Sequence, residues 1–336
     1  MLRVVDAGDT CAARSQALWH GIASAMTAAD APVLSLCRPS APYVCLGYHC
    51  NVEEIDRDVC RREGVAVLRR QIGGGPVWID SDQLFFQITV PWQQAPARVD
   101  ELYERLLGPA VEAFRELGLD ASLRGVNDIA IGDRKISGTG AGRIGDGVTV
   151  VGNLLYRFPH ERMATILAVP SDGARAECLR LMRHRVTSME TEGMARPADA
   201  DVKRALVSAY ARALGLSPTF SVLTAAEEGA IARWEARVAE PDWVAGPRRP
   251  TAQLRQVKIC ADVFVVAGAT GEVVVEASLV DGKFDRVQID GVGSAARRIE
   301  AAIVVQELAA LPAALGEFGA DGARVLELLS SARRIA

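Results

Sequence analysis

The sequence lacks the features that mark several large classes of protein. No uninterrupted apolar run reaches the ~18 residues that a membrane-spanning helix needs, because charged or strongly polar residues interrupt every candidate. The first fifteen residues place Asp6 and Asp9 where a signal peptide would carry its apolar core. The seven cysteines are odd in number and include no C-x-x-C pair, which argues against a disulfide framework and a structural zinc site. We therefore expect a cytoplasmic protein with reduced thiols and no membrane partner.

The chain also lacks an excess of positive charge. Its 38 lysines and arginines are outweighed by 42 aspartates and glutamates, which gives a net charge of −4. No overall cationic field exists to attract nucleic acid, so we expect no nucleic-acid partner. With 49% hydrophobic and 24% charged residues in a chain of 336, the composition is that of an ordinary globular protein of about two domains.

Proline and glycine predict where the two domains meet. Residues 236–250 change composition abruptly, and Pro241, Gly246, Pro247 and Pro250 mark them as a linker. This linker separates a large domain over residues 1–240 from a small α/β domain over residues 251–336.

Apolar periodicity predicts the main elements of both domains. In the large domain it indicates helices over residues 15–26, 102–117 and 199–214, and strands over residues 65–69, 77–79 and 84–90. In the small domain it indicates strands over residues 257–267, 272–280 and 284–289, then two helices, the first striped by Ile299, Ile303, Val304, Leu308 and Leu311. Asp281 and Gly282 suit a type I′ hairpin turn between the last two strands.

A literal G-x-G-x-x-G motif is formed by Gly140, Gly142 and Gly145. A dinucleotide-binding loop of this kind must follow a strand and open a helix, whose first amides receive the pyrophosphate. Here the motif leads into the strand-forming residues 148–151, so we reject the dinucleotide interpretation. A kinase-type loop is rejected as well, because no H-R-D or D-F-G partner occurs.

A second glycine-rich segment, residues 69–80 with the sequence RRQIGGGPVWID, is more informative. Gly73, Gly74 and Gly75 remove every Cβ atom from a loop between two strands, so a ligand can lie directly on the backbone amides. Arg69 and Arg70 precede the loop and are placed to pair with an anion there. The alternative is a glycine-rich hairpin with two solvated arginines, and the residues alone leave both open.

The segment NDIAIGDRKISG, residues 127–138, carries the third group of candidates. Asn127 and Asp128 end a turn at the start of a strand, where a carboxylate could hold Mg²⁺. Lys135 lies on the return strand and projects a compact positive charge. Its spacing alone favours a surface lysine on a hairpin, and the two segments become informative only together.

Together the two segments resemble a known family. RRQIGGGPVWID is similar to the R-R-x-S/T-G-G-G-A-V-Y-x-D motif of lipoate–protein ligases of the A type, and NDIAIGDRKISG is similar to their N-D-L-x-x-x-G-R-K-I-S-G motif. GNLLY at residues 152–156 and RVTSM at residues 185–189 resemble two further motifs in the same order. The resemblance covers most of residues 30–190. It implies the α+β fold shared by lipoate ligases, biotin ligases and class II synthetase catalytic domains, with a small accessory domain after it.

The resemblance also implies a function. It implies an ATP-dependent ligase that activates lipoate as an acyl-adenylate and transfers it to a lysine of a small lipoyl carrier domain. Lys135 would be the catalytic residue, while Asp128 with Asn127 would hold Mg²⁺ on the phosphates. The other implied binding residues are Arg69, Arg70, Gly73, Gly74, Gly75, Val77, Ser137, Gly138 and Gly152. Replacing Lys135 should stop adenylate formation and leave the fold intact, since one hairpin lysine should matter little to stability.

Several positions depart from the family pattern. Ile79 and the pair Val150 and Val151 stand where several members carry histidine, and Asn153 replaces threonine. Pro76 replaces alanine and removes a backbone donor beside the triple glycine. We expect a branch of the family with an altered acyl pocket or a distinct acceptor.

Two other functions remain as alternatives. A related branch moves octanoyl groups through a cysteine thioester without ATP, but residues 123–126, where its nucleophile lies, contain no cysteine. His49 and Cys50 are adjacent and could suggest a thiol–imidazole pair. Neighbouring residues on a strand point to opposite faces, so we do not expect the two to act together. The last alternative is a non-catalytic module that binds lipoate or lipoylated domains.

Overall fold

The computed structural model describes residues 1–246 and 254–331, and the chain divides into two compact units. The N-terminal unit comprises Met1–Pro159 and Val186–Pro247, and the C-terminal unit comprises His160–Arg185 and Arg248–Ala336. The expected boundaries, 1–240 and 251–336, place residues 160–185 in the large domain, whereas contacts group them with the C-terminal unit. Unit membership is set by long-range packing, which local composition does not record.

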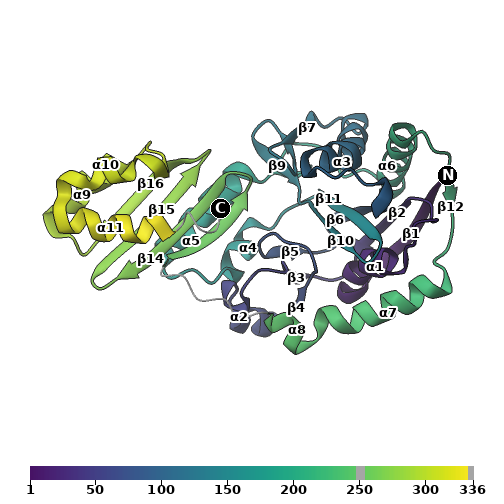
Figure 1. Cartoon of the computed structure of the whole chain (residues 1–336), viewed down its shortest axis with the longest axis horizontal. Helices are drawn as coiled ribbons and strands as arrows, with labels where there is room; N and C mark the ends of the chain where they lie inside the picture. Colours follow the sequence, from purple (N-terminus) through teal and green to yellow (C-terminus); the bar gives the residue numbers. More distant parts are fainter. Residues whose placement is uncertain (247–253, 332–336) are drawn as a thin grey trace. The chain divides into compact units, whose positions relative to one another are not determined.

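A mixed six-stranded sheet forms the centre of the N-terminal unit (Figure 1). Neighbouring strands of this sheet are β10 (Gly140–Ile144), β11 (Gly147–Leu155), β6 (Gln83–Pro91), β2 (Val33–Pro39), β1 (Leu2–Thr10) and β12 (Pro218–Phe220). Strands β1, β2 and β12 are parallel, and the remaining pairs are antiparallel. All nine residues of β6 are buried, as expected of a central strand rich in β-forming residues.

Two three-stranded sheets carry the segments that the sequence analysis singled out. The first joins β4 (Ala66–Arg69), β3 (Tyr43–Leu46) and β5 (Val77–Ile79), so the glycine loop connects its two edge strands. The second joins β7 (Ala121–Arg124), β8 (Asp128–Ile131) and β9 (Arg134–Ser137) as a meander.

The helices of the N-terminal unit cover its sheets. They are α1 (Ala12–Ala25), α2 (Arg57–Arg62), α3 (Val99–Glu116), α6 (Asp199–Leu214), α7 (Ala225–Ala239) and α8 (Pro241–Ala245). The expected helices over residues 15–26, 102–117 and 199–214 are confirmed by α1, α3 and α6. A Cβ atom at Gly21 would lie 2.4 Å from Cγ1 of Ile231, so glycine at this position lets α1 and α7 pack closely.

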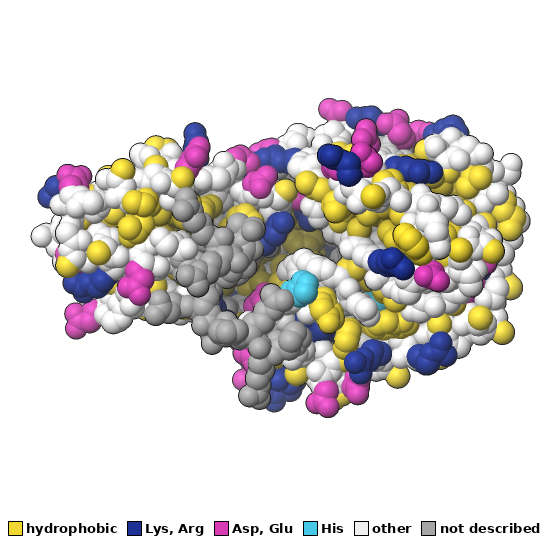
Figure 2. All heavy atoms as spheres, in the orientation of Figure 1, with side chains coloured by type: hydrophobic (Ala, Val, Ile, Leu, Met, Phe, Trp, Pro, Cys, Tyr) yellow, Lys and Arg dark blue, Asp and Glu magenta, His cyan; other side chains and the backbone are white. Residues whose placement is uncertain are grey.

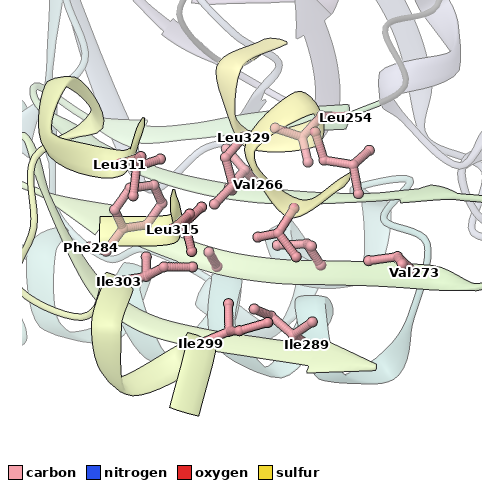
Figure 3. Packing of buried hydrophobic residues seen from close by; sticks show 14 of the residues in the cluster. Leu254, Val266, Val273, Phe284, Ile289, Ile299, Ile303, Leu311, Leu315 and Leu329 are labelled. Carbon is pink, nitrogen blue, oxygen red and sulfur yellow. The ribbon is translucent and has the colours of Figure 1, made fainter. Parts of the chain in front are cut away.

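The C-terminal unit is built on a four-stranded antiparallel sheet. Its strands, in order, are β13 (Leu254–Cys260), β14 (Val263–Thr270), β15 (Val273–Val280) and β16 (Lys283–Asp290). Its helices are α4 (His160–Ile166), α5 (Asp172–Arg185), α9 (Ala296–Ile303), α10 (Leu311–Leu315) and α11 (Gly319–Ser331). Figure 3 shows the apolar core between the sheet and α9, α10 and α11, to which Phe284, Ile299 and Leu311 belong.

Three expectations for the small domain meet different outcomes. The hairpin turn is confirmed, because Asp281 and Gly282 both have positive φ values of 51° and 80°. The single strand over 257–267 is wrong: Asp262 adopts a φ of 58° and divides it into β13 and β14. The helical stripe from Ile299 to Leu311 is also wrong, because α9 ends at Ile303 and the chain turns at Val305, where φ is 64°.

The segment expected as a linker is largely helical where it is described. Residues 236–239 belong to α7, and α8 starts at Pro241, a residue type whose fixed φ suits the first turn of a helix. Residues 247–250 lie outside the described part of the chain. Figure 2 shows basic and acidic side chains interspersed over the drawn face rather than gathered by sign. No helix among residues 1–246 and 254–331 is both long and apolar enough to cross a bilayer.

Candidate active site

The glycine loop, residues 72–75, is held by its backbone carbonyls. The amide of Tyr48 donates to the carbonyl of Ile72 at 2.8 Å, and the thiol of Cys50 donates to that of Gly74 at 3.1 Å. Arg70 donates to the carbonyls of Gly73 at 2.8 Å and Gly75 at 3.0 Å. All four consecutive carbonyls are therefore fixed by groups of the protein itself.

The amides of the glycine loop are left available by this arrangement. Within the described chain, Gly73, Gly74 and Gly75 donate no backbone hydrogen bond, and Gly73 and Gly74 are exposed. Gly74 has a φ of +95°, so the loop bends in a way that side chains rarely allow. Successive unpaired amides in such a bend form a nest that attracts phosphate or carboxylate oxygens. Pro76 has no amide, which limits the nest to the three glycines.

The two arginines before the glycine loop serve as braces in this structure. Arg69 is fully buried and donates to the carbonyls of Gly47 at 2.7 Å, Cys50 at 2.7 Å and Val244 at 2.7 Å. Burial lowers the pKa of the Arg69 guanidinium. Arg70 is also buried and contacts the loop carbonyls. Their pairing with a bound anion stays a prediction, and the contacts seen here are with the protein backbone.

Lys135 is part of an ion pair. On β9, its Nζ lies 2.6 Å from Oδ1 of Asp128 at the start of β8, and the Asp128 side chain is only 4% exposed. The Lys135 side chain is 21% exposed, so it is neither a solvated surface lysine nor a fully buried one. The amide of Thr187, from the RVTSM segment, donates to the carbonyl of Lys135 at 2.8 Å. Asp128 thus holds the ammonium group, while Thr187 restrains the backbone of Lys135.

Asn153 links the lysine hairpin to the central sheet, a role that the sequence analysis missed. Its Oδ1 accepts from the backbone amide of Gly138 at 2.6 Å, and its backbone N–H donates to Oγ of Ser137 at 3.2 Å. Its Nδ2 donates to Oε1 of Gln83 at 2.7 Å, and Gln83 in turn donates to the carbonyl of Trp78. Asparagine supplies a donor and an acceptor in one planar group, which a threonine does not.

Ile72 connects the glycine loop with the strand that follows the lysine hairpin. Cβ atoms built at Gly140 and Gly142 would lie 2.7 and 2.5 Å from the Ile72 side chain. The Gly140-x-Gly142 pair therefore makes room for Ile72. Because Gly140 lies only five positions after Lys135, this contact ties the loop to the lysine segment.

The remaining expected residues line the same elements. Val77 opens β5 and pairs with Cys45 of β3. A Cβ atom at Gly152 would lie 2.3 Å from Cζ of Phe86, so this glycine gives room to a core ring. The backbone carbonyl of Asn127 accepts a hydrogen bond from the Thr139 hydroxyl.

Tyr103 on α3 is a second residue that sequence reasoning missed. Its hydroxyl interacts with the Asn127 side chain and lies near Asp128, and burial raises its pKa to about 12. It is therefore a neutral neighbour of the ion pair. Its position within a helical apolar stripe gave no sign of this polar contact.

The family departures make apolar contacts. Ile79 is buried in a hydrophobic cluster with Tyr43 and Leu68. Val150 is fully buried, and Val151 packs with Ile72. Positions that carry histidine in several family members thus belong to the core in this chain.

The described residues contain no group of three histidine, cysteine, aspartate or glutamate side chains that could enclose a metal. Mg²⁺ in nucleotide-dependent enzymes usually needs only one or two carboxylates besides water and phosphate oxygens. Asp128 supplies one carboxylate beside Lys135. Asp128 is therefore a residue that would fit an ion arriving on a nucleotide.

Comparison with family models places the site in a known context. The model of the lipoyl protein ligase A/B catalytic domain matches residues 12–211, which is more than half of the chain. The chain belongs to the lipoyl protein ligase A/B family. The matched residues include the glycine loop, the Lys135 hairpin and Asn153, so the resemblance inferred from the motifs is confirmed.

Relatives of this lipoyl ligase family member include enzymes of two reaction types. It is 27% identical over 149 residues to lipoate-protein ligase LplJ of Bacillus subtilis, and the alignment covers 44% of each chain. It is 24% identical over 251 residues to octanoyltransferase LipM of Symbiobacterium thermophilum, with 67% of this chain and 91% of the transferase covered. The chain thus spans less than half the length of the curated Bacillus ligase that it matches.

Solved structures confirm the expected fold. A bipartite lipoate protein ligase from Thermoplasma acidophilum, studied with its E2 lipoyl domain, superposes with a TM-score of 0.67 at 22% identity over 74% of this chain and 98% of that one. A lipoate-protein ligase A bound with ATP gives a TM-score of 0.62 at 22% identity over 73% and 98%. Over about three quarters of its length the chain therefore has the α+β architecture of these lipoate ligases.

Proposed function

We propose that the protein is an ATP-dependent ligase that activates lipoate, or a close medium-chain analogue, as an acyl-adenylate and transfers the acyl group to a lysine of a small carrier domain. The observation that carries the proposal is the glycine loop, whose carbonyls are all held inward while three consecutive amides remain unpaired. Such a nest recognises an anion through its backbone, and the positive φ of Gly74 disfavours a side chain at its centre, which suits an acyl phosphate anhydride.

The first step joins two anions and therefore needs positive charge. A carboxylate oxygen of lipoate attacks the α-phosphorus of ATP, a P–O bond to the β-phosphate breaks, and pyrophosphate leaves. The Lys135 ammonium offsets the repulsion and the charge that develops in the transition state. The amides of Gly73–75 donate to oxygens of the same group. Mg²⁺ supplies further neutralisation of the phosphates when bound, with Asp128 as the protein carboxylate available to it.

The second step transfers the acyl group. A neutral lysine amine of the carrier attacks the carbonyl carbon of the adenylate, the C–O bond to AMP breaks, and the amine proton is lost as AMP departs. Lys135 steadies the oxyanion that forms. Support for a lipoyl carrier as acceptor comes from the Thermoplasma relative, whose structure was studied together with its E2 lipoyl domain.

A second candidate is ATP-independent octanoyl transfer, which the long alignment with LipM favours. A transferase needs a thiolate nucleophile, and Cys50 is the thiol that contacts the glycine loop. Burial raises the pKa of Cys50 to about 12, so its thiol stays protonated at neutral pH. Residues 123–126 supply no cysteine either. The ligase is therefore the better supported proposal.

The test is to incubate the protein with lipoate and Mg-ATP, without a carrier, and to measure pyrophosphate and the acyl-adenylate. A carrier domain is then added and its mass is measured. We expect both products and an acylated carrier. Acylation from an octanoyl donor without ATP would favour the transferase, and tight lipoate binding without either product would favour a non-catalytic module.

The variants Lys135→Ala and Lys203→Ala form a matched pair for this assay. Both lysines are ion-paired in the N-terminal unit, because Lys203 lies 2.7 Å from Asp6. We expect the first variant to lose adenylate formation and the second to keep it. Equal activity of both variants would contradict the role given to Lys135.

A further inference from the structure

His20 on α1 is a buried titratable residue that the proposed mechanism leaves without a role. Its side chain is fully buried, and its ring makes tilted contacts with Trp19, at a centroid distance of 3.5 Å, and with Trp234 of α7, at 4.5 Å. No metal spacing around it is visible in the sequence. Its ring nitrogens nevertheless make two specific hydrogen bonds.

The two hydrogen bonds fix the tautomer of the imidazole. Nδ1 lies 2.7 Å from the carbonyl of Gln16, which can only accept, so Nδ1 carries the hydrogen. Nε2 then holds a lone pair and accepts from the backbone amide of Gln71 at 3.0 Å. Burial lowers the pKa of His20 to about 3, with the charge of Arg70 as a further cause. The ring is therefore neutral at physiological pH and remains an acceptor toward Gln71.

Gln71 is the residue that leads into the glycine loop. The carbonyls of the loop are held by Arg70 and by residues 48–50, which all belong to the same three-stranded sheet region. The bond to His20 comes from a different element, α1, and restrains the loop at the amide just before Ile72. It thereby limits the rotation of the loop about its first residues.

We propose that His20 is a positioning residue that holds the glycine loop in its anion-binding shape through the Gln71 amide. The proposal deepens the proposed function and rests on it for its catalytic consequence. His20 does not touch the reacting atoms, and it acts through the orientation of the amides of residues 73–75. A misplacement of about 1 Å in such a site costs on the order of 10²-fold in rate, so loss of one restraint should be measurable.

Two substitutions test the roles of the two ring nitrogens separately. His20→Gln places an amide oxygen where Nε2 lies, and so keeps an acceptor for Gln71. His20→Asn places an amide NH₂ where Nδ1 lies, and so keeps the bond to Gln16 but leaves the Gln71 amide without a partner. Ser24→Ala is the control for loosened packing around His20, because it removes the bond of the Trp234 indole to Ser24, at 2.8 Å, and the bond of Ser24 to the His20 carbonyl, but leaves both ring nitrogens paired.

The experiment measures hydrogen exchange of the peptide that spans residues 70–77 and the kinetics of adenylate formation in all four chains. We expect faster exchange in His20→Asn than in wild type, His20→Gln or Ser24→Ala. We also expect about tenfold lower kcat/KM for adenylate formation in His20→Asn, with substantial rescue in His20→Gln.

Hydrogen exchange and kinetics distinguish a failure of the His20 proposal from a failure of the proposed function. The proposal is overturned if hydrogen exchange of residues 70–77 is unchanged in His20→Asn. It is also overturned if both His20 variants lose activity equally and the loss follows their lower melting temperatures. Faster exchange with unchanged kinetics in His20→Asn overturns its catalytic part. An inactive wild type contradicts the proposed function, while the exchange of residues 70–77 still decides whether His20 anchors the loop.

Discussion

Replacement of Lys135 should destabilise the fold as well as stop adenylate formation. The sequence alone predicts little effect on stability, since Lys135 lies on a hairpin. The structure pairs its Nζ with Oδ1 of Asp128 at 2.6 Å, and the Asp128 side chain is 4% exposed. Removing one partner of a buried pair typically costs ~3–5 kcal/mol, because the other charge stays buried. Lys135 itself is one-fifth exposed, so we expect about 3 kcal/mol for Lys135→Ala.

The assay is urea unfolding of wild type, Lys135→Ala, Asp128→Asn and the double variant at pH 7. The double variant should regain part of the stability that Lys135→Ala loses, because no buried carboxylate charge then remains without the lysine. Lys203→Ala breaks a more exposed pair with Asp6 and should cost less than ~1 kcal/mol. A Lys135→Ala chain as stable as wild type, with no coupling to Asp128, would refute this account of the pair.

Three further predictions concern the surroundings of the site. Asn153→Leu should slow adenylate formation and lower the free energy of unfolding in urea by ~1–3 kcal/mol, because the amide of Gly138 loses its acceptor. Unchanged values would contradict the role of Asn153 in linking the lysine hairpin to the central sheet. Gly74→Ala should destabilise the chain and weaken ATP binding measured by calorimetry, since the φ of Gly74 is +95° and the new Cβ would lie 2.7 Å from Arg70. Unchanged stability and ATP affinity would contradict the role of this bend in the anion-binding nest. His20 is neutral when folded because burial lowers its pKa to about 3, while the unfolded imidazole takes up a proton below pH 6.5. The free energy of unfolding should therefore fall as pH drops from 6.5 toward 3, by up to ~5 kcal/mol more in wild type than in His20→Gln. The same pH dependence in both chains would contradict a neutral, buried His20.

Local patterns in the sequence predicted the elements whose signals are local. The apolar stripes of α1 and α3 and the Asp281–Gly282 turn are each set by residues within one or two turns of chain. The division of the strand over 257–267 depends on Asp262 taking a left-handed conformation, which aspartate adopts only in some contexts. The placement of residues 160–185 in the C-terminal unit depends on packing against a sheet that begins about seventy residues after α5 ends. No local signal records such a contact.

The motifs predicted the residues of the candidate site, but not the contacts that hold them in place. The Gly73–75 loop and Lys135 stand out in sequence because of their residue types and their family resemblance. The groups that hold the loop come from far along the chain: Cys50 contacts Gly74, and the buried Arg69 reaches the carbonyl of Val244. Such contacts follow from the tertiary fold, so the sequence indicates which residues can act while packing determines how they are held.

The most direct test of the account is a single-turnover measurement with lipoate and ATP labelled at the α-phosphate, in the absence of any carrier. The account predicts an acyl-adenylate that stays with the wild-type protein, a matching release of pyrophosphate, and neither product from Lys135→Ala. Transfer of an acyl group from a thioester donor without ATP, with no labelled adenylate at any time, would contradict it.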